Sequence, residues 1–524
     1  MIHMLCPVIL SAAKNLWPPT SLKRGLRILR CAQNDKALPI FHIFLFKQVV
    51  SFVQKYYVWT QQLLHEVSHR LARALEDKKQ KNSIAVLDGV RGIACLMVVV
   101  YHICRIANST YLWDPFSLAY PLFGSIAYAG SAGVTLFFVL SGFLLFMPYA
   151  KALLVEHTSW PMARRFYLRR AFRIIPAYYA CLFLLILIYQ RQYLEPAHWK
   201  ELGLFLIFFM ESSSITYQKI NGPFWTLGVE WQFYMLLPLI ALATGLIVLR
   251  LFRGGSMQRR LWLVVSCLGA LIGWGLFSRY WGYYFSIHPS ATFLVPRAVL
   301  NRILFFTYGS YGKFLEDFAV GMLTSLLFIY AQQLSTAGVF NRIIRRLSPW
   351  LWGTGILLLV FSAMWRFNQG RLAWSFFGSL NPPYNWFGEL AFALGFGLCI
   401  FAILFGVQAL KRPFEWRPLR WIGLISFSLY MWHLPLLIFF MTNVANHLRG
   451  WNPALVLSLY VVWACLVIIP FSALSYLLIE KPGMALGEKL WGRLEKKWQP
   501  ADKQAVAVNT EPVKGAAERE LAKW

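Results

Sequence analysis

The stretch LDGVRGIACLMVVVYH, residues 87–102, decides how the rest of the chain is interpreted. Most of it is apolar enough for a helix inside a lipid bilayer, yet Asp88 and Arg91 stand near its start and His102 ends it. Charged and titratable side chains are costly in hydrocarbon, so those that occur there usually have a function. The stretch therefore predicts a membrane helix that carries part of a functional site.

The composition of the whole chain is that of an α-helical protein that crosses a membrane several times. Of its 524 residues, 58% are hydrophobic and only 14% are charged, whereas soluble domains have about 25% charged residues. The apolar residues gather in runs near the roughly 20 residues that a helix needs to cross a bilayer. We therefore expect an all-α, polytopic bundle of transmembrane helices.

The formal net charge of +29 does not require a nucleic-acid partner. The basic residues stand in short segments between the hydrophobic runs, which is the pattern of cytoplasmic loops. The eight cysteines have no spacing typical of a metal site or of a disulfide framework, and most lie within hydrophobic runs. We therefore expect buried free thiols, no metal site and no nucleic-acid binding.

Ten segments are predicted to span the membrane, and the distribution of basic loops supports this number. An eleventh apolar segment, 199–211, is short and bounded by charged residues. If it does not cross, all the basic loops lie on one side of the membrane, as the positive-inside rule favours. We therefore expect both termini in the cytoplasm of a bacterium, with 199–211 in the interface or re-entering from the outer side. The ten predicted spans are 87–107, 132–150, 174–190, 228–249, 261–279, 314–331, 349–366, 387–409, 421–442 and 454–479.

The two ends of the chain differ from its centre. In residues 1–40 a short apolar run precedes basic residues, the reverse of a secretory signal peptide, so we interpret them as an atypical extension from a misassigned start. Residues 41–83 predict an amphipathic cytoplasmic or interfacial helix. Residues 84–483 form the predicted membrane domain. Residues 484–524 are expected to be a polar, partly disordered tail.

Helix geometry puts the titratable residues of the first span on one face. Arg91 and His102 are eleven residues apart, which is about three turns and roughly 16 Å along the axis. Asp88 lies on the same face. Each has a structural explanation alone, since Asp88 could cap the helix, Arg91 could reach the headgroups and His102 could be bonded within the bundle. Together they favour a site, with Arg91 near the cytoplasm and His102 near mid-membrane.

Three further segments carry polar residues at predicted helix positions. Ser141, in GVTLFFVLSGFLLF (133–146), stands beside a glycine and suits a close helix crossing. The stretch RRFYLRRAFRIIPAYY (164–179) has more arginines than a topology signal needs, so they could hold a polyphosphate near the first span. Glu230, in GPFWTLGVEWQFYMLLPL (222–239), is an acid at the start of an otherwise apolar span, which solubility does not explain.

Six motifs stand in a specific order along the chain: LDGVRGIACLMVVVYH, LFFVLSGFLL, RRAFRIIPAYY, WTLGVEWQFYMLLPL, FSLYMWHLPLL and YLLIEKP. In this order they resemble the acyltransferase 3 family, integral membrane enzymes that O-acylate carbohydrates and related acceptors. The resemblance covers about residues 84–483. It implies an O-acyltransferase that uses acyl-CoA as a co-substrate.

The resemblance also assigns roles to residues. The family's histidine and arginine of the first helix fall on His102, as a catalytic residue, and on Arg91, which would engage acyl-CoA. The family's acid falls on Glu230. The basic motif falls on Arg169, Arg170 and Arg173. One position departs from the family, because Lys313 stands where many members have an arginine; lysine keeps the charge but lacks the planar fork.

Acyl transfer from a thioester to a hydroxyl requires a base for the weak nucleophile and stabilisation of an oxyanion. We expect acyl-CoA, in the first instance acetyl-CoA, to dock among the arginines, with its pantetheine arm reaching His102. His102 would act as general base or as covalent acyl carrier. Glu230 would orient His102 or hold the acceptor, a carbohydrate or lipid-linked sugar, and Asp88 would steer Arg91. No bound cofactor is expected.

Two alternatives to an enzyme remain at this stage. A transporter or flippase of a polar or lipid-linked solute would use the same charged residues, but such proteins often show an internal repeat, and the first span has no counterpart later in the chain. A purely structural membrane subunit would not need the charged stripe. Two other histidines are weaker candidates. His433 precedes Pro435 and is interpreted as part of a packing and kink motif, and His288 could contact an acceptor from an outer loop.

Overall fold

The computed structural model describes residues 84–109, 120–155, 158–251, 256–334, 339–369, 375–448 and 450–498, with four isolated positions before them (66, 69, 72 and 73). Within these residues the chain is helical, with one isolated β-bridge between Phe293 and Val295 and no strand. This confirms the all-α prediction. The predictions for residues 1–40 and for almost all of 41–83 lie outside the described residues.

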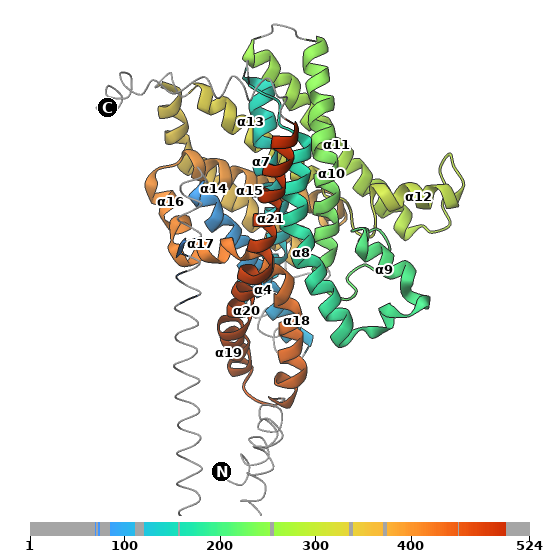
Figure 1. Cartoon of the computed structure of the whole chain (residues 1–524). Helices are drawn as coiled ribbons and strands as arrows, with labels where there is room; N and C mark the ends of the chain where they lie inside the picture. The colour runs from blue at the N-terminus through green and yellow to red at the C-terminus, as the bar shows by residue number, and fades with distance from the viewer. Residues whose placement is uncertain are drawn as a thin grey trace, which may run out of the picture. The chain divides into compact units, whose positions relative to one another are not determined.

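The helices that form the bundle are shown in Figure 1. They are α4 (Ala85–Ser109), α6 (Pro121–Tyr128), α7 (Gly133–Leu154), α8 (Ala163–Tyr189), α9 (Trp199–Leu206), α10 (Phe224–Leu251), α11 (Met257–Ile287), α12 (Arg297–Thr307), α13 (Leu315–Leu334), α14 (Val339–Asn368), α15 (Asn381–Phe405), α16 (Gln408–Glu415), α17 (Arg417–Leu424), α18 (Ser426–Asn443), α19 (Pro453–Trp463), α20 (Ile469–Ser475) and α21 (Lys481–Trp498). Short 3₁₀ turns are η1 (Ala129–Ala132), η2 (Arg191–Leu194), η3 (Pro196–His198), η4 (Ser375–Phe377) and η5 (Ala445–Leu448), and the π turns η6 (Ala464–Ile468) and η7 (Tyr476–Glu480) connect α19, α20 and α21.

Each of the ten predicted spans corresponds to helical structure. Among the described residues, eight segments are long and apolar enough to cross a membrane, or nine if α17 and α18, which meet at a bend of 77°, form one span. The difference from ten is α13, which begins with Glu316 and Asp317 and is therefore less apolar. Most of its residues, including both acids, are buried. The protein is thus a polytopic helical membrane protein in which α13 is enclosed by other helices.

The short segment 199–211 does not form a spanning helix. Helix α9 has only eight residues, and the chain from Ile207 to α10 is irregular, with positive φ angles at Phe208 and Gln218. Glu211, Thr216 and other residues of this loop are nevertheless buried. Irregular backbone inside a membrane protein is tolerated where protein covers it or where it lines a cavity, and this loop does both.

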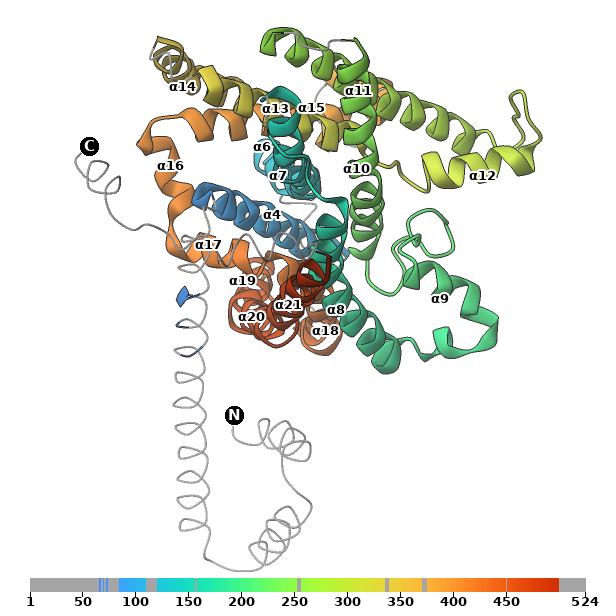
Figure 2. The ribbon, with the colours of Figure 1, turned by 45° about the horizontal axis from the view of Figure 1, so that its top comes forward.

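Helix α4 is held by unusually close crossings with its neighbours, and Figure 2 shows it between α7 and α17. A Cβ atom added at Gly423 of α17 would lie 1.7 Å from the carbonyl oxygen of Asp88. A Cβ added at Gly92 would lie 2.4 Å from the carbonyl oxygen of Leu419. Small residues permit such backbone-to-backbone packing. The glycines of the LDGVRG motif therefore set the position of Asp88 and Arg91.

Close backbone packing at glycines also joins α7 to α13. A Cβ at Gly142 would lie 2.1 Å from the carbonyl oxygen of Phe318, and a Cβ at Gly321 would lie 2.1 Å from that of Val139. This confirms the prediction of a close crossing at Ser141-Gly142. It also presents the Ser141 side chain to α10.

Two predictions about the periphery need adjustment. The polar tail expected from residue 484 is helical as far as Trp498, because α21 continues the last span and packs along α8. The six described cysteines are free, as expected, but not all are buried, since Cys267 is half-buried and Cys465 is exposed. Neither residue lines a cavity described below.

Substituting Gly142 by Leu should destabilise the fold, because the side chain has no room against the backbone of α13. Overpacking of this kind costs about 1–3 kcal/mol. We expect a lower melting temperature and a lower yield of monodisperse protein in detergent. Gly353→Leu in α14 is the matched control, since nothing lies within 4 Å of a Cβ there. Equal melting temperatures for the two variants would contradict the close crossing.

Candidate active site

A cluster of charged residues forms where α4, α8 and α10 meet. Arg91 of α4 lies within electrostatic reach of Arg173 of α8 and of Glu230 of α10, and Arg170 lies within reach of the same two residues. Arg91, Glu230 and Ser141 line one small cavity of about 50 Å³. The structure therefore brings together most of the residues that the motifs suggested.

Glu230 is held firmly within this cluster. Its Oε1 atom accepts a hydrogen bond of 2.8 Å from Ser141 Oγ and another from the hydroxyl of Tyr234. It lines the small cavity with Arg91 and is absent from the wall around His102. Glu230 therefore bonds to α7 and to its own helix among the arginines, and its expected role toward His102 or the acceptor stays a prediction.

Arg169 and Asp88, two further residues that the sequence predicted for the site, have oppositely charged partners on other helices. Arg169 Nε lies 2.8 Å from Glu488 Oε1 of α21, and both side chains are about half exposed. Asp88 is buried, and its Oδ2 atom lies 3.9 Å from an amino group of Arg420 on α17. Asp88 is also within electrostatic reach of Arg91, which fits the predicted steering role. Arg169, in contrast, joins α8 to α21.

His102 lines a second, much larger cavity of about 1510 Å³. Typical ligand pockets measure about 300–1,000 Å³, so this cavity is larger than a pocket for one small ligand. Val134 and Tyr430 line both the large and the small cavity. Arg91 and His102, on the same helix, therefore serve neighbouring cavities that meet at these two residues. His288, the weaker candidate in the outer loop, lines neither.

His433, interpreted above as a packing residue, is in direct contact with His102. Its Nε2 atom lies 3.2 Å from His102 Nδ1, the ring centroids are 4.9 Å apart, and the side chain is fully buried. The sequence did hold a signal for a functional role of His433, because it is a second histidine inside a predicted span. The neighbouring Pro435 offered a structural explanation, and sequence alone does not reveal a contact across 331 positions.

Hydrogen bonds determine which nitrogen of each ring carries the proton. A carbonyl oxygen only accepts, so His433 Nδ1 donates to the carbonyl of Tyr430 at 2.8 Å and its Nε2 is left as an acceptor. His102 Nδ1 faces the carbonyl of Val98 at 2.9 Å and His433 Nε2, so it must be the protonated nitrogen. The lone pair of His102 is therefore on Nε2, as a general base requires.

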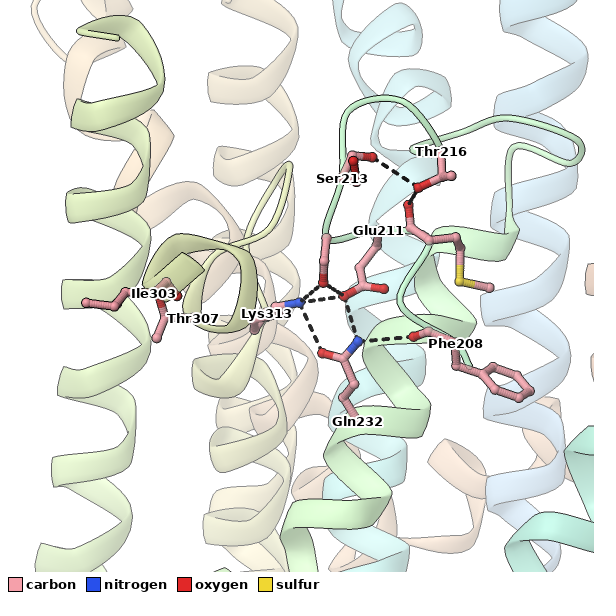
Figure 3. Close-up of polar contacts among 10 residues, drawn as sticks. Phe208, Glu211, Ser213, Thr216, Gln232, Ile303, Thr307 and Lys313 are labelled. Atoms are coloured by element: carbon pink, nitrogen blue, oxygen red, sulfur yellow. Dashed lines mark hydrogen bonds and ion pairs between the residues drawn. The ribbon is translucent and has the colours of Figure 1, made fainter. Parts of the chain in front are cut away.

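Lys313 occupies a socket of three oxygen atoms, shown in Figure 3. Its ammonium donates to Glu211 Oε1 at 2.5 Å, Ser212 Oγ at 2.7 Å and Gln232 Oε1 at 3.0 Å. Three acceptors match the three donors of a lysine, which explains why a planar arginine fork is not needed here. Burial lowers the pKa of Lys313, and the Glu211 carboxylate opposes this shift. The socket joins the buried loop to α10 and to the segment preceding α13.

The match to known proteins agrees with this architecture. The model of a family described as an acyltransferase domain matches residues 84–474. The chain therefore belongs to this family of acyltransferases, and the resemblance seen in the motifs is confirmed. No solved structure matches the chain.

Several curated proteins are similar to the chain. The putative peptidoglycan O-acetyltransferase YrhL of Bacillus subtilis is 23% identical over 431 residues, covering 78% of this chain and 56% of that protein. The peptidoglycan O-acetyltransferase OatA of Listeria monocytogenes is 24% identical over 373 residues, covering 67% and 49%. The O-acetyltransferase OatA of Staphylococcus aureus is 22% identical over 442 residues, covering 81% and 61%. The chain thus spans about half to three fifths of the length of these relatives.

The proton positions in the histidine pair are directly measurable. In the nitrogen-15 NMR spectrum of histidine-labelled protein in lipid, we expect His102 to show a protonated Nδ1 and an unprotonated Nε2. Its signals are those that disappear in His102→Ala, with His288→Ala as the control. In His433→Phe we expect the Nδ1 signal of His102 to shift, because its acceptor is lost. A protonated Nε2 in His102 at neutral pH would contradict the assignment.

Proposed function

We propose that this protein is a membrane-bound O-acyltransferase. It moves an acyl group, in the first instance acetyl, from cytoplasmic acyl-CoA to a hydroxyl of a carbohydrate or glycolipid acceptor. The observation that carries the proposal is His102, whose unprotonated Nε2 belongs to a side chain lining a cavity larger than a pocket for one small ligand. The names of the relatives support acetyl as the group and a peptidoglycan glycan as the acceptor.

The arginine cluster provides the donor site. Arg91, Arg170 and Arg173 carry three positive charges, and Glu230 provides one negative charge. Guanidinium groups bind phosphate oxygens in a fork-to-fork geometry, so the cluster suits the phosphates of coenzyme A. By the positive-inside rule this end of α4 faces the cytoplasm, in a bacterial cell membrane with both termini inside. Glu230 then holds the arginines in place.

The acyl group reaches His102 through the junction of the two cavities. The Thr226 hydroxyl lies 2.7 Å from that of Tyr430, and the ring of Tyr430 packs edge-on against Phe137 at 5.9 Å. A small cavity of about 50 Å³ does not accommodate a pantetheine arm. Entry of the donor therefore requires Tyr430 to turn away from Thr226, which couples donor binding to opening of the passage.

The chemistry follows from the proton positions. His102 Nε2 takes the proton of the acceptor hydroxyl as the oxygen attacks the thioester carbonyl. The C–S bond then breaks, and the imidazolium returns the proton to the departing thiolate. A covalent acyl-histidine route would use the same nitrogen as nucleophile. The acyltransferase family match favours this chemistry over the transporter alternative.

Replacing His102 by Ala should reduce transfer strongly, because it removes the imidazole that would take the proton of the acceptor hydroxyl. The measurement is transfer of label from radioactive acetyl-CoA to soluble peptidoglycan fragments by purified protein in lipid. We expect a loss of about 10²–10⁴-fold, the usual contribution of general base catalysis. His288→Ala serves as the control for folding and insertion. Full transfer by His102→Ala would refute the mechanism.

Replacing Arg91 by Ala should weaken donor binding. Loss of a charge-assisted hydrogen bond of about 1.5–3 kcal/mol corresponds to a roughly 10- to 150-fold weaker affinity for acetyl-CoA. Arg191→Ala, in η2 just after α8, is the control, since that side chain is exposed and, in the part of the chain that the structure describes, donates to the Leu187 carbonyl four residues earlier. An unchanged dissociation constant for acetyl-CoA in Arg91→Ala would remove the arginine cluster from the donor site.

A further inference from the structure

A second polar group lines the same large cavity as His102 and takes no part in the reaction described above. Its centre is an ion pair between Arg366 of α14 and Glu389 of α15, with 2.6 Å between the amino nitrogen and Oε1 and 12% of each side chain exposed. Three hydroxyl side chains complete the group: Ser131 of η1, Thr135 of α7 and Tyr384 of α15. All five residues line the cavity. We call them the hydroxyl wall.

Each hydrogen bond of the hydroxyl wall joins one group that donates to one that accepts. Arg366 donates from Nε to the Tyr384 hydroxyl at 2.5 Å and from an amino group to Ser131 Oγ at 2.6 Å. Thr135 Oγ1 donates to Glu389 Oε2 at 2.9 Å, and Ser131 Oγ donates to the Tyr128 carbonyl at 3.0 Å. The protons of Thr135 and Ser131 are therefore committed within the protein. The proton of Tyr384 is not used in its bond with Arg366.

Some donors and acceptors of the hydroxyl wall are not used in bonds within the wall, and they indicate the chemistry of a ligand. Tyr384 offers a donor, whereas Thr135 and Glu389 offer acceptor lone pairs. An alcohol both donates and accepts, so neighbouring hydroxyls of one molecule match this mixed set. A phosphate or carboxylate only accepts and would be repelled by Glu389. The Arg366–Glu389 pair is also neutral as a unit, so the pair by itself does not attract an anion.

The surrounding surface suits the same ligand. Tyr101 and Tyr128 line the cavity with their rings 5.9 Å apart, and Trp225 and Tyr311 line it with theirs 6.2 Å apart. Aromatic rings with polar tips give apolar faces beside hydrogen-bonding groups. A sugar ring has the same combination, since its C–H faces are apolar and its edges carry hydroxyls.

We propose that the hydroxyl wall is the binding subsite for the acceptor, an uncharged, polyhydroxylated sugar ring. Tyr384, Thr135 and Glu389 hydrogen-bond its hydroxyls and so position the ring within the cavity into which His102 faces. The inference deepens the proposed function, on which it rests for the identity of the acceptor. The wall is a binding and positioning element, and the proton transfer remains with His102.

A purely structural role for the ion pair is the competing explanation. Helices α14 and α15 are, however, also closely packed about three turns away from the ion pair, since a Cβ at Gly355 would lie 2.7 Å from the Cys399 sulfur and 3.0 Å from the Gly395 carbonyl oxygen. A partly exposed ion pair inside a membrane protein is costly unless it serves a function. The experiment therefore has to separate ligand binding from stability.

The test uses substitutions that remove one hydroxyl and leave Arg366 and Glu389 in place. Tyr384→Phe removes the free donor, and Thr135→Val removes a neighbouring acceptor. Thr324→Val is the matched control, because Thr324 is buried in α13, bonds to the carbonyl of its own Val320 and does not line the cavity. Binding of soluble peptidoglycan fragments to each purified protein is measured by calorimetry without any donor, and the melting temperature is recorded in parallel.

We expect the dissociation constant for the fragments to rise about 5- to 30-fold in Tyr384→Phe and Thr135→Val, as for the loss of one hydrogen bond to a buried site. Thr324→Val should bind like the wild type. In transfer assays the two wall variants should raise the KM for the fragments and leave that for acetyl-CoA unchanged. A melting temperature like that of the wild type together with weakened binding in the two wall variants would exclude a merely structural role.

Equal binding by wild type and both wall variants would overturn the inference, as would wild-type protein that binds no fragments or a KM for acetyl-CoA that rises to the same extent. The binding arm is independent of catalysis. If the wild type binds the fragments through the wall but transfers no acyl group to them, the subsite stands and the proposed function fails. If transfer occurs and the wall variants behave as the wild type, the function stands and the subsite fails.

Discussion

The packing of helix α4 against protein along its polar face is the constraint on which the site depends. Titratable residues in a spanning helix have to face other helices or a cavity, because lipid offers them no partner. Glycines at the crossing with α17 bring the two backbones into contact beside Asp88 and Arg91. Farther along the same helix, contact with α18 places His102 on His433. One helix thereby holds Arg91, the proposed donor-binding residue, and His102, the proposed base, at a separation set by the rise of the helix.

In the proposed reaction, each of the two cavities holds one of the substrates. The small one is lined by Arg91 and Glu230 and the large one by His102 and the hydroxyl wall, with Val134 and Tyr430 common to both. Such an arrangement keeps the two substrates on different sides until the acyl group passes Tyr430. Exclusion of water from the junction of the two cavities would protect the thioester of the donor from hydrolysis. The carbonyl of Tyr430 also accepts from His433, so the residue at the junction is bonded to the histidine pair.

Sequence alone predicted the parts of this arrangement that lie within one helix. The stripe of Asp88, Arg91 and His102 follows from helical periodicity, and the ten helical segments follow from runs of apolar residues. Contacts between distant helices were not predictable in this way. Arg366 and Glu389 stand in separate spans with no motif around them, and their pairing depends on how α14 and α15 pack. The hydrogen bond between Ser141 and Glu230 likewise joins residues 89 positions apart and depends on how α7 and α10 pack.

The central claim is that one acyl donor reaches from the arginine cluster to His102. The most direct measurement is a structure of the protein, by electron cryomicroscopy in lipid, with a non-hydrolysable acyl-CoA analogue bound. The account predicts phosphates among Arg91, Arg170 and Arg173, the ring of Tyr430 turned away from Thr226, and the acyl carbonyl within about 3.5 Å of His102 Nε2, the distance of a reactive complex. An analogue bound with its acyl carbonyl outside the large cavity, or with its phosphates away from the arginines, would contradict it.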